Sequence, residues 1–151
     1  MWAAMGATSA LGYTSPTYLT GYGKRFAGSD SISAYGGGSH VVSDYAWTFE
    51  NSGPYPYNKT HPVGTTGGGG NANELGLYDM SGNVGEWCWD WYAEPYPSGT
   101  LSDYRGSPSG TYRELRGGCW ADNAQDVNVA HRLSVFPADR DGSTGFRVVR
   151  H

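Results

Sequence analysis

The sequence predicts one domain of short strands and many turns around an aromatic core, rather than a helical bundle. Glycine accounts for 24 of the 151 residues, and aromatic residues make up 15%. Strong helix formers such as Lys, Gln and Glu are scarce. Aromatic residues favour strands and glycines favour turns, and the length is sufficient for a single domain with its own core.

The charge pattern excludes two classes of partner. The formal net charge is -4, and the Lys and Arg residues are scattered, so neither nucleic acid nor an anionic membrane surface is expected. No apolar run is long enough to cross a bilayer, so membrane insertion by this segment is not expected. Residues 1–7 resemble the end of a helix stopped at Gly6 rather than a signal peptide, which predicts an N-terminally truncated domain.

The first half of the chain is predicted to be mainly loop. Residues 8–45 are rich in Gly, Ser, Thr and Tyr, with Phe26 and Tyr35 as expected anchors. A short strand is predicted over residues 45–49. Residues 51–73 contain three prolines and a run of glycines, so they form another long connection.

Alternating tryptophans indicate the clearest strand. One face of this strand would carry Trp87, Trp89 and Trp91, and the other would carry Cys88, Asp90 and Tyr92. Because each indole ring has a large apolar surface, the tryptophan face is expected to belong to the core, with a ligand platform as the alternative. Residues 93–112 form a third polar connection.

Residues 115–150 combine two rigid ends with a permissive middle. Arg-Gly-Gly-Cys-Trp at 116–120 and Gly-Phe-Arg-Val-Val at 145–149 are predicted to be fixed, and a polar segment lies between them. Loops held by rigid frames carry most binding function, so this region is the expected recognition site. Cys88 and Cys119 form no metal-binding or redox motif, and either one disulfide or two small buried side chains would suit them.

Three motifs identify a family resemblance: Asn73 with the run at 76–87, Leu-Arg-Gly-Gly-Cys-Trp at 115–120, and Gly-Phe-Arg-Val-Val at 145–149. Together they resemble the formylglycine-generating enzyme family, also called the sulfatase-modifying-factor domain. The resemblance covers nearly all of residues 1–151 and implies one α+β domain. Its fold would be C-type-lectin-like, with much irregular loop structure and the family's first strands missing.

The same resemblance implies that the oxidase chemistry is missing. Family members that oxidise a sulfatase cysteine use a cysteine pair just after the Gly-Gly motif, because soft thiolates hold Cu(I). The matching positions here are Asp122 and Val127. Cys119 takes the family's usual Ser position, and a lone cysteine there cannot supply the pair. The chain is therefore expected not to be an enzyme of this type.

Two further positions depart from or match the family pattern. Gly85 replaces the usual Trp, so either a neighbouring side chain fills that space or a surface pocket opens. Asn83 and Glu86 match positions that help bind a structural calcium in some members. Two ligands fall short of the roughly six to eight oxygens that calcium takes. A turn-capping Asn and a salt-bridged or surface Glu are the alternative, and no cofactor is predicted.

Residues 121–144 also resemble the variable regions of diversity-generating retroelements, which rewrite adenines in a template. Many of their target proteins have this lectin-like fold. Such a system would vary sixteen positions here, including Gly142 and Thr144. The other fourteen are the expected ligand-binding residues: Ala121, Asp122, Asn123, Asp126, Asn128, His131, Leu133, Ser134, Val135, Phe136, Ala138, Asp139, Asp141 and Ser143.

A fixed frame is predicted between these positions. Its members are Val127, Val129, Ala130, Arg132, Pro137 and Arg140. The two valines would share one strand face in the core, and the two arginines would pair with buried carboxylates such as Asp90. The apolar residues at 133, 135 and 136 would form an exposed contact patch.

Three functions compete on these grounds. The first is a non-catalytic binding domain that displays a diversified surface, residues 115–150, to a protein or glycan partner. The second is a formylglycine-generating oxidase or a related sulfatase-modifying enzyme. The third is a structural accessory domain of a surface lipoprotein. The family resemblance suggests the cell surface or secretion as the location, which the sequence itself does not identify.

Overall fold

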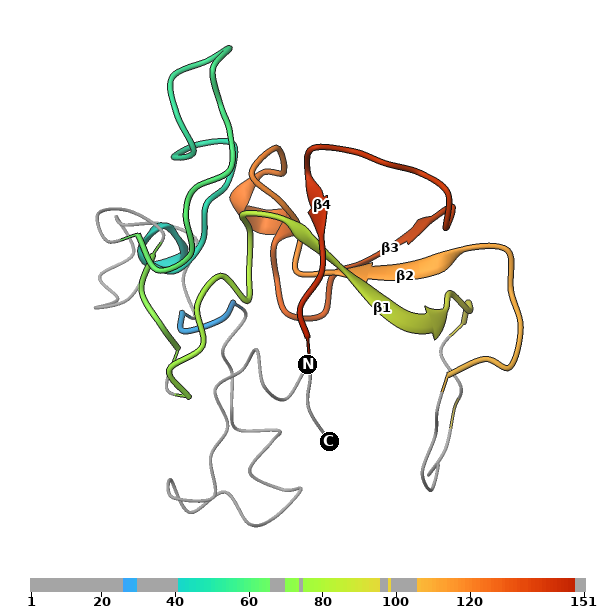
Figure 1. The fold of residues 1–151 in the computed structure, drawn as a ribbon. Helices are drawn as coiled ribbons and strands as arrows, with labels where there is room; N and C mark the ends of the chain where they lie inside the picture. The colour runs from blue at the N-terminus through green and yellow to red at the C-terminus, as the bar shows by residue number, and fades with distance from the viewer. Residues whose placement is uncertain are drawn as a thin grey trace, which may run out of the picture.

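The computed structural model describes residues 26–29, 41–65, 70–73, 75–95, 98 and 106–148. These residues are mostly strand and loop, as predicted. In Figure 1 the strands gather on the right, and the segment 41–65, coloured cyan to green, lies on the left. The regular elements are two short 3-10 helices, η3 (Val42–Asp44) and η4 (Ala124–Asp126), and four strands, β1 (Gly85–Trp91), β2 (Arg113–Arg116), β3 (Arg132–Val135) and β4 (Thr144–Gly145). The expected helix end at 1–7 and the anchor Tyr35 lie outside the described residues.

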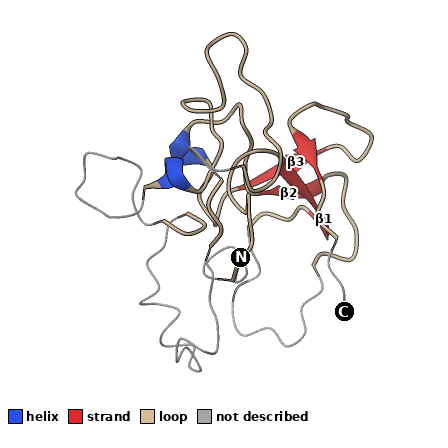
Figure 2. Cartoon of the chain, turned by 60° about the vertical axis from the view of Figure 1, so that its left-hand side comes forward, coloured by secondary structure: helices blue, strands red, loops and turns tan. Residues whose placement is uncertain are grey.

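The four strands form one sheet in the order β3-β2-β1-β4. Figure 2 shows β1, β2 and β3 side by side. β2 pairs antiparallel with both β1 and β3, whereas β4 pairs parallel with β1. Glu86 lies opposite Arg116, and Arg116 lies opposite Arg132. The sheet therefore connects the two ends of the 115–150 region through β1.

A small apolar core joins the N-terminal loops to the C-terminal half. Phe26, Val42, Ala46 and Val127 are all almost completely buried, and Ala124 packs against them. The prediction of Phe26 as an anchor is confirmed. Because Val127 belongs to the same cluster, the middle of the 115–150 region is attached to the body of the protein.

The strand predicted over residues 45–49 is wrong. Trp47 makes a single parallel bridge, to Gly82, and the chain around it turns. The Asn51 amide takes the backbone groups that a partner strand would need: its Nδ2 donates to Ala46 O at 2.9 Å, and its Oδ1 accepts from Thr48 N at 2.7 Å. Because the Asn51 side chain occupies these backbone groups, they cannot pair with a neighbouring strand, and the segment forms a loop.

The prediction that three tryptophans form the core is also wrong. Trp89 is 86% exposed, and Trp87 and Trp91 are half-buried. The register between β1 and β2 shifts between Trp87 and Trp91, so strict alternation of faces does not persist along β1. The Arg113 guanidinium lies 3.6 Å from the Trp91 ring centroid and 5.0 Å from that of Trp89.

Leu115 fills the space beside Gly85. A Cβ built at Gly85 would lie 2.5 Å from Leu115 Cδ2, and Leu115 is 5% exposed. Of the two alternatives for the missing family Trp, the structure therefore shows a refilled site rather than an opened pocket at this position.

Candidate functional site

The predicted recognition region begins at a tight turn after β2. Gly117 and Gly118 have φ of 88° and 67°, which favour glycine. A Cβ at Gly118 would lie 2.8 Å from Val127 Cγ1. The turn thus needs glycine both for its backbone conformation and for close packing on the buried Val127.

Polar contacts hold the first part of the region. Asp122 Oδ2 accepts a hydrogen bond from Cys119 N at 2.9 Å, and Asp122 O accepts one from Phe49 N at 2.8 Å. Ala124 N donates to both Glu50 carboxylate oxygens at 3.1 Å. The carboxylate of Asp122, a predicted ligand-binding residue, therefore caps the turn.

The predicted frame is corrected in two respects. Residues 127–129 form no strand, since η4 ends just before Val127 and Val129 lies in a turn. Of the two valines, only Val127 is buried in the core, whereas Val129 is half-buried. Ala130, like two later frame positions, Pro137 and Arg140, is exposed.

Arg132 pairs with Glu114 rather than with Asp90. Its Nη2 lies 3.3 Å from Glu114 Oε2 and donates to Ala93 O at 2.6 Å, and its guanidinium lies 4.3 Å from the Tyr92 ring centroid. The carboxylate of Glu114, which is 6% exposed, also pairs with Arg116. The antiparallel register of β2 and β3 brings these side chains onto one face. Among the described residues, Arg140 has no ion pair.

None of the fourteen predicted binding residues is buried. The half-buried ones are Asp122, Asp126, Asn128, His131, Val135 and Ser143. The exposed ones are Ala121, Asn123, Leu133, Ser134, Phe136, Ala138, Asp139 and Asp141. This exposure is what a contact surface requires.

An aromatic and apolar patch lies at the end of β3. Leu133 is 40% exposed and Phe136 is 47% exposed. Phe136 packs edge-on against Tyr112, with ring centroids 4.6 Å apart and an interplanar angle of 66°. Tyr112, which precedes β2, is itself 40% exposed. Tyr112 was not predicted, because it lies outside the 115–150 region and only the β2–β3 register brings it to Phe136.

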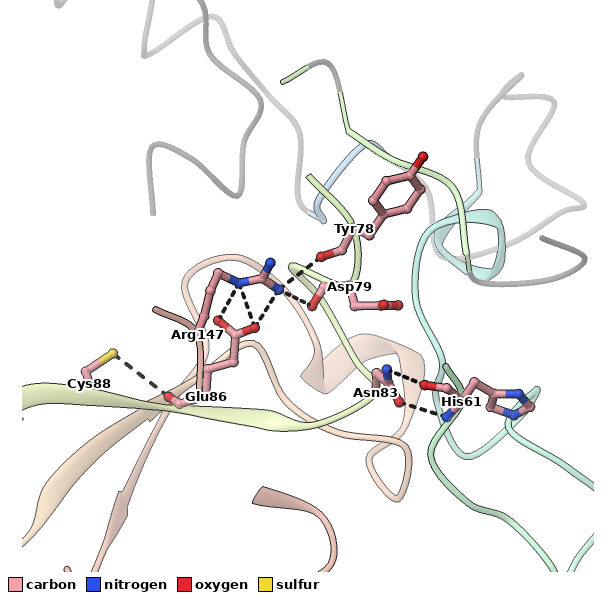
Figure 3. A network of polar contacts seen from close by, with 7 residues as sticks. All are labelled: His61, Tyr78, Asp79, Asn83, Glu86, Cys88 and Arg147. Atoms are coloured by element: carbon pink, nitrogen blue, oxygen red, sulfur yellow. Dashed lines mark hydrogen bonds and ion pairs between the residues drawn. The ribbon is translucent and has the colours of Figure 1, made fainter. Parts of the chain in front are cut away.

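Figure 3 shows a polar network that ties β1 to the chain after β4. Arg147 Nε donates to the two Glu86 oxygens at 2.9 and 3.1 Å, and Arg147 Nη2 lies 2.6 Å from Glu86 Oε1. The same Nη2 donates to Tyr78 O at 2.9 Å and lies 3.4 Å from Asp79 O. Glu86 is therefore salt-bridged, which was one of the two sequence-based interpretations.

The Asn83 amide bonds to the backbone of His61 in both directions, as Figure 3 shows. Its Oδ1 accepts from His61 N and its Nδ2 donates to His61 O, each at 3.0 Å. Asn83 has a φ of 63°, a conformation that Asn tolerates better than most residues. The calcium interpretation for Asn83 and Glu86 stays untested. Among the described residues, no group of three His, Cys, Asp or Glu side chains could hold a metal ion.

Both cysteines are free thiols. Burial raises the pKa of Cys88 and of Cys119, and the neighbouring Glu114 and Asp122 carboxylates, respectively, raise them further. A raised pKa lowers the fraction of each side chain that is thiolate, which is the form that acts as a nucleophile.

A pocket of about 850 Å³ lies beside β1. Its lining residues are Leu77, Met80, Glu86, Trp87, Cys88, Trp89, Asp90, Arg116, Arg147 and Val148. This pocket was not predicted, because its lining comes from separate segments and the tryptophan face of β1 was expected to be core.

The Asp79 carboxyl makes the stability of the folded protein depend on pH. Burial raises the pKa of its carboxyl, outweighing the opposite effects of Gly64, Asn83 and Arg147 nearby. Neither carboxylate oxygen has a hydrogen-bond partner of good geometry among the described residues. Because the folded-state pKa is raised, the stabilisation by this group is fully present below its unfolded pKa and is lost as pH rises through the folded pKa.

Asp79→Asn should therefore raise the free energy of unfolding at neutral pH. The difference from the unmodified chain should vanish at about pH 3, where both side chains are neutral. Asn also tolerates the φ of 53° at this position. Urea unfolding at the two pH values measures the effect, and a variant that is less stable at neutral pH would show that neighbours stabilise the carboxylate.

No helix among the described residues is both long and apolar enough to span a membrane.

Comparison with known proteins agrees with the sequence motifs. Residues 7–151 match the Sulfatase-modifying factor enzyme 1-like domain. Chaperone protein LppX of Paenibacillus barcinonensis is 33% identical over 155 residues, covering 93% of this chain and 50% of that protein. The formylglycine-generating enzyme of Thermomonospora curvata is 33% identical over 119 residues, covering 73% of this chain and 38% of the enzyme.

Among solved structures, Treponema denticola variable protein 1 is similar with a TM-score of 0.72 at 34% identity. The match covers 96% of this chain and 42% of that one. The predicted C-type-lectin-like fold and the predicted resemblance to variable proteins are confirmed. The chain spans half or less of the length of each of these three relatives.

Proposed function

Because the chain belongs to the sulfatase-modifying factor enzyme 1-like domain family, and because it resembles a variable protein over nearly its whole length, we propose that it is a non-catalytic ligand-binding domain. Residues 115–150 would form its variable region. The observation that carries this proposal is the combination of a buried anchor at Val127 with fourteen predicted binding residues of which none is buried.

This arrangement separates stability from recognition. Val127 and the Glu114–Arg132 pair fix the region at two points. Substitutions at exposed positions away from such anchors usually change stability by about half a kcal/mol or less. The surface can therefore vary in sequence while the fold persists. Asp122 is a predicted binding residue whose carboxylate instead stabilises the turn, by accepting a hydrogen bond from Cys119 N.

The enzyme alternative has less support. Asp122 and Val127 occupy the positions of the oxidase cysteine pair, and Val127 is part of the core. The two cysteines that are present are half-buried and buried, with raised pKa values. Tight copper binding together with oxidation of a peptide cysteine would establish the enzyme and overturn the binding proposal.

The partner in this proposal is a protein or glycan surface. The exposed apolar patch at Leu133 and Phe136 supports such contacts, since aromatic and apolar anchors supply most of the binding energy at interfaces. A location at the cell surface or outside the cell belongs to the same proposal. An accessory structural role within a surface lipoprotein is the remaining alternative.

A display library tests the proposal directly. The eight exposed binding positions would be randomised in the whole 151-residue chain, with Val127, Glu114 and Arg132 unchanged. We expect most members to fold, as judged by protease resistance, and binders to emerge against a panel of purified proteins. A control library varies the exposed residues Tyr55, Tyr57 and Val63 of the 41–65 loop and should yield fewer binders.

Two outcomes would count against the proposal. Equal yields from the two libraries would show that the region has no special role. The neighbouring genes distinguish the binding proposal from the accessory structural role. If the binding proposal is right, a reverse transcriptase gene and a near-copy of the segment encoding residues 121–144 should lie close to the coding sequence. The absence of both would favour the structural role.

A further inference from the structure

The pocket beside β1 has no part in the proposed function. None of the fourteen predicted binding residues lines it. Its volume of about 850 Å³ falls within the range of roughly 300–1,000 Å³ that is typical of small-molecule sites. The lining comes from β1, from β2, from the loop before β1 and from the chain after β4. The pocket is therefore a second candidate site, separate from the predicted binding positions.

The pairing of β1 explains where the pocket lies. On the side of β1 away from β2, β4 pairs with Gly85 and Glu86. At the other end of β1, Trp91 pairs with β2 on one edge and bridges to Ser107 on the other. Residues 86–90 line the pocket. The pocket therefore lies beside the part of β1 between these two pairings.

Three of the four charged side chains in the lining are already paired. Glu86 and Arg147 form the ion pair shown in Figure 3, and Arg116 pairs with Glu114. The fourth is Asp90, which is half-buried. Its carboxylate takes part in no hydrogen bond or ion pair within the part of the chain that the structure describes. The lining therefore carries one unmatched charge, and that charge is negative.

The rest of the lining suits the apolar body of a ligand. Its apolar members are Leu77, Met80, Trp87, Trp89 and Val148. Trp89 is 86% exposed, so a ligand can reach its ring. The faces of aromatic rings attract cations, and the Arg113 guanidinium already lies over Trp91, which it approaches more closely than Trp89. The surroundings of Asp90 thus combine a negative charge with aromatic and aliphatic surface.

We propose that this pocket binds a small organic cation, an amine with an aromatic or aliphatic body. The ammonium group pairs with the Asp90 carboxylate, and the apolar body packs on Trp89 and the apolar side chains beside it. Because Asp90 is half-buried, water screens this ion pair less than it screens a fully exposed one. The site goes beyond the proposed function, which concerns a protein or glycan partner at other residues.

Two other classes of ligand fit the pocket less well. An anion needs a cation that is not already paired, but both arginines of the lining pair with carboxylates. A metal ion needs several ligands, and no group of three His, Cys, Asp or Glu side chains in the described ranges could hold one. An organic cation needs only the one carboxylate, because its apolar body supplies the remaining contacts.

Nuclear magnetic resonance titration of the unmodified 151-residue chain at neutral pH tests the charge preference. The probes share one carbon skeleton: phenylpropylamine, phenylpropanol and phenylpropanoate. We expect the amine to shift the amide signals of residues 86–90 and the indole N–H signal of Trp89, with a Kd about tenfold lower than that of the alcohol. The amide signals of Leu133 and Phe136 should not move. No binding of the amine, or a Kd no lower than that of either other probe, would overturn the inference.

Two variants that each remove one negative charge assign the preference to Asp90. Asp90→Asn keeps the shape of the side chain, so the amine should bind as weakly as the alcohol, and the alcohol should bind as before. Glu94→Gln is the matched control, because Glu94 is exposed, follows β1 and does not line the pocket. It should change the affinity for the amine by less than about twofold. Equal losses in the two variants would show that overall charge attracts the amine, and the inference would fail.

Trp89→Ala tests the apolar half of the site. Because Trp89 is exposed, the variant should keep the dispersed amide spectrum of a folded protein, and the amine and the alcohol should both bind about fivefold more weakly. Tyr55→Ala removes an aromatic ring of similar exposure outside the pocket and should change neither affinity. Unchanged binding in Trp89→Ala would place the ligand elsewhere and contradict the inference.

A second copy of the chain is the other possible occupant. A dimer in sedimentation whose dissociation shifts the signals of residues 86–90 would show that the copy covers the pocket, and it would overturn the inference. None of these experiments alters a predicted binding residue. Their failure would therefore leave the proposed function as it stands, and failure of the display library would leave the amine site as it stands.

Discussion

Replacing Arg147 with alanine should lower the free energy of unfolding by about 2–3 kcal/mol. The change leaves the Glu86 carboxylate, whose side chain is only 19% exposed, without its cation. It also removes the donor to the carbonyl of Tyr78. A fully exposed ion pair contributes about 0–1 kcal/mol, but this pair is two-pronged and partly shielded, so the larger figure applies.

Chemical denaturation measures this effect, and two variants serve as controls. Arg140→Ala removes an exposed arginine that has no ion pair among the described residues, and it should change stability by about 0.5 kcal/mol or less. Arg147→Lys keeps the positive charge but lacks the planar guanidinium that makes two hydrogen bonds at once, so its loss of stability should be intermediate. If Arg147→Ala were as mild as Arg140→Ala, the network in Figure 3 would have no role in stability.

The sequence left a salt bridge as one of several possibilities for Glu86, and it could not show which arginines pair with which carboxylates. Glu86 and Arg147 lie 61 positions apart, and the parallel pairing of β1 with β4 brings them together. Asp90 was expected to hold Arg132, yet Glu114 does so. Pairing is decided by strand register, and register depends on the whole sheet rather than on local spacing.

Periodicity has a similar limit. The tryptophan alternation correctly located β1, but it could not show which face is buried or that the register shifts midway. The exposed Trp89 follows from that shift. The burial of Val127 was predicted correctly, although no strand forms there. The turn at Gly117 and Gly118 was not predicted, and it requires the positive φ that glycine adopts easily.

The contact between Tyr112 and Phe136 was beyond prediction for the same reason. The segment around Leu133 and Phe136 was predicted to be an exposed apolar patch, and both residues are exposed. That Tyr112 joins this patch depends on the pairing of β2 with β3. Side-chain chemistry thus indicated a contact surface, whereas only the strand register shows which further aromatic residue belongs to it.

Gly85→Trp, which restores the usual family residue, should destabilise the protein by about 3 kcal/mol or more. The first atom of the new side chain would already lie 2.5 Å from Leu115 Cδ2. Leu115 is 5% exposed, so its buried side chain has little room to turn away from an indole ring. Gly142→Trp is the matched control, since nothing lies within 4 Å of a Cβ there, and it should be nearly neutral.

The companion change is Leu115→Ala, which alone should cost about 2–4 kcal/mol by leaving a cavity. If Leu115 occupies the space of the family tryptophan, the two changes compensate each other. The double variant should then be more stable than Gly85→Trp alone, and its total loss should fall short of the sum of the single losses by about 1 kcal/mol or more. Additive losses in urea unfolding would show that the two sites do not share one space. A coupling would establish that Leu115 occupies the space that a side chain at position 85 would need.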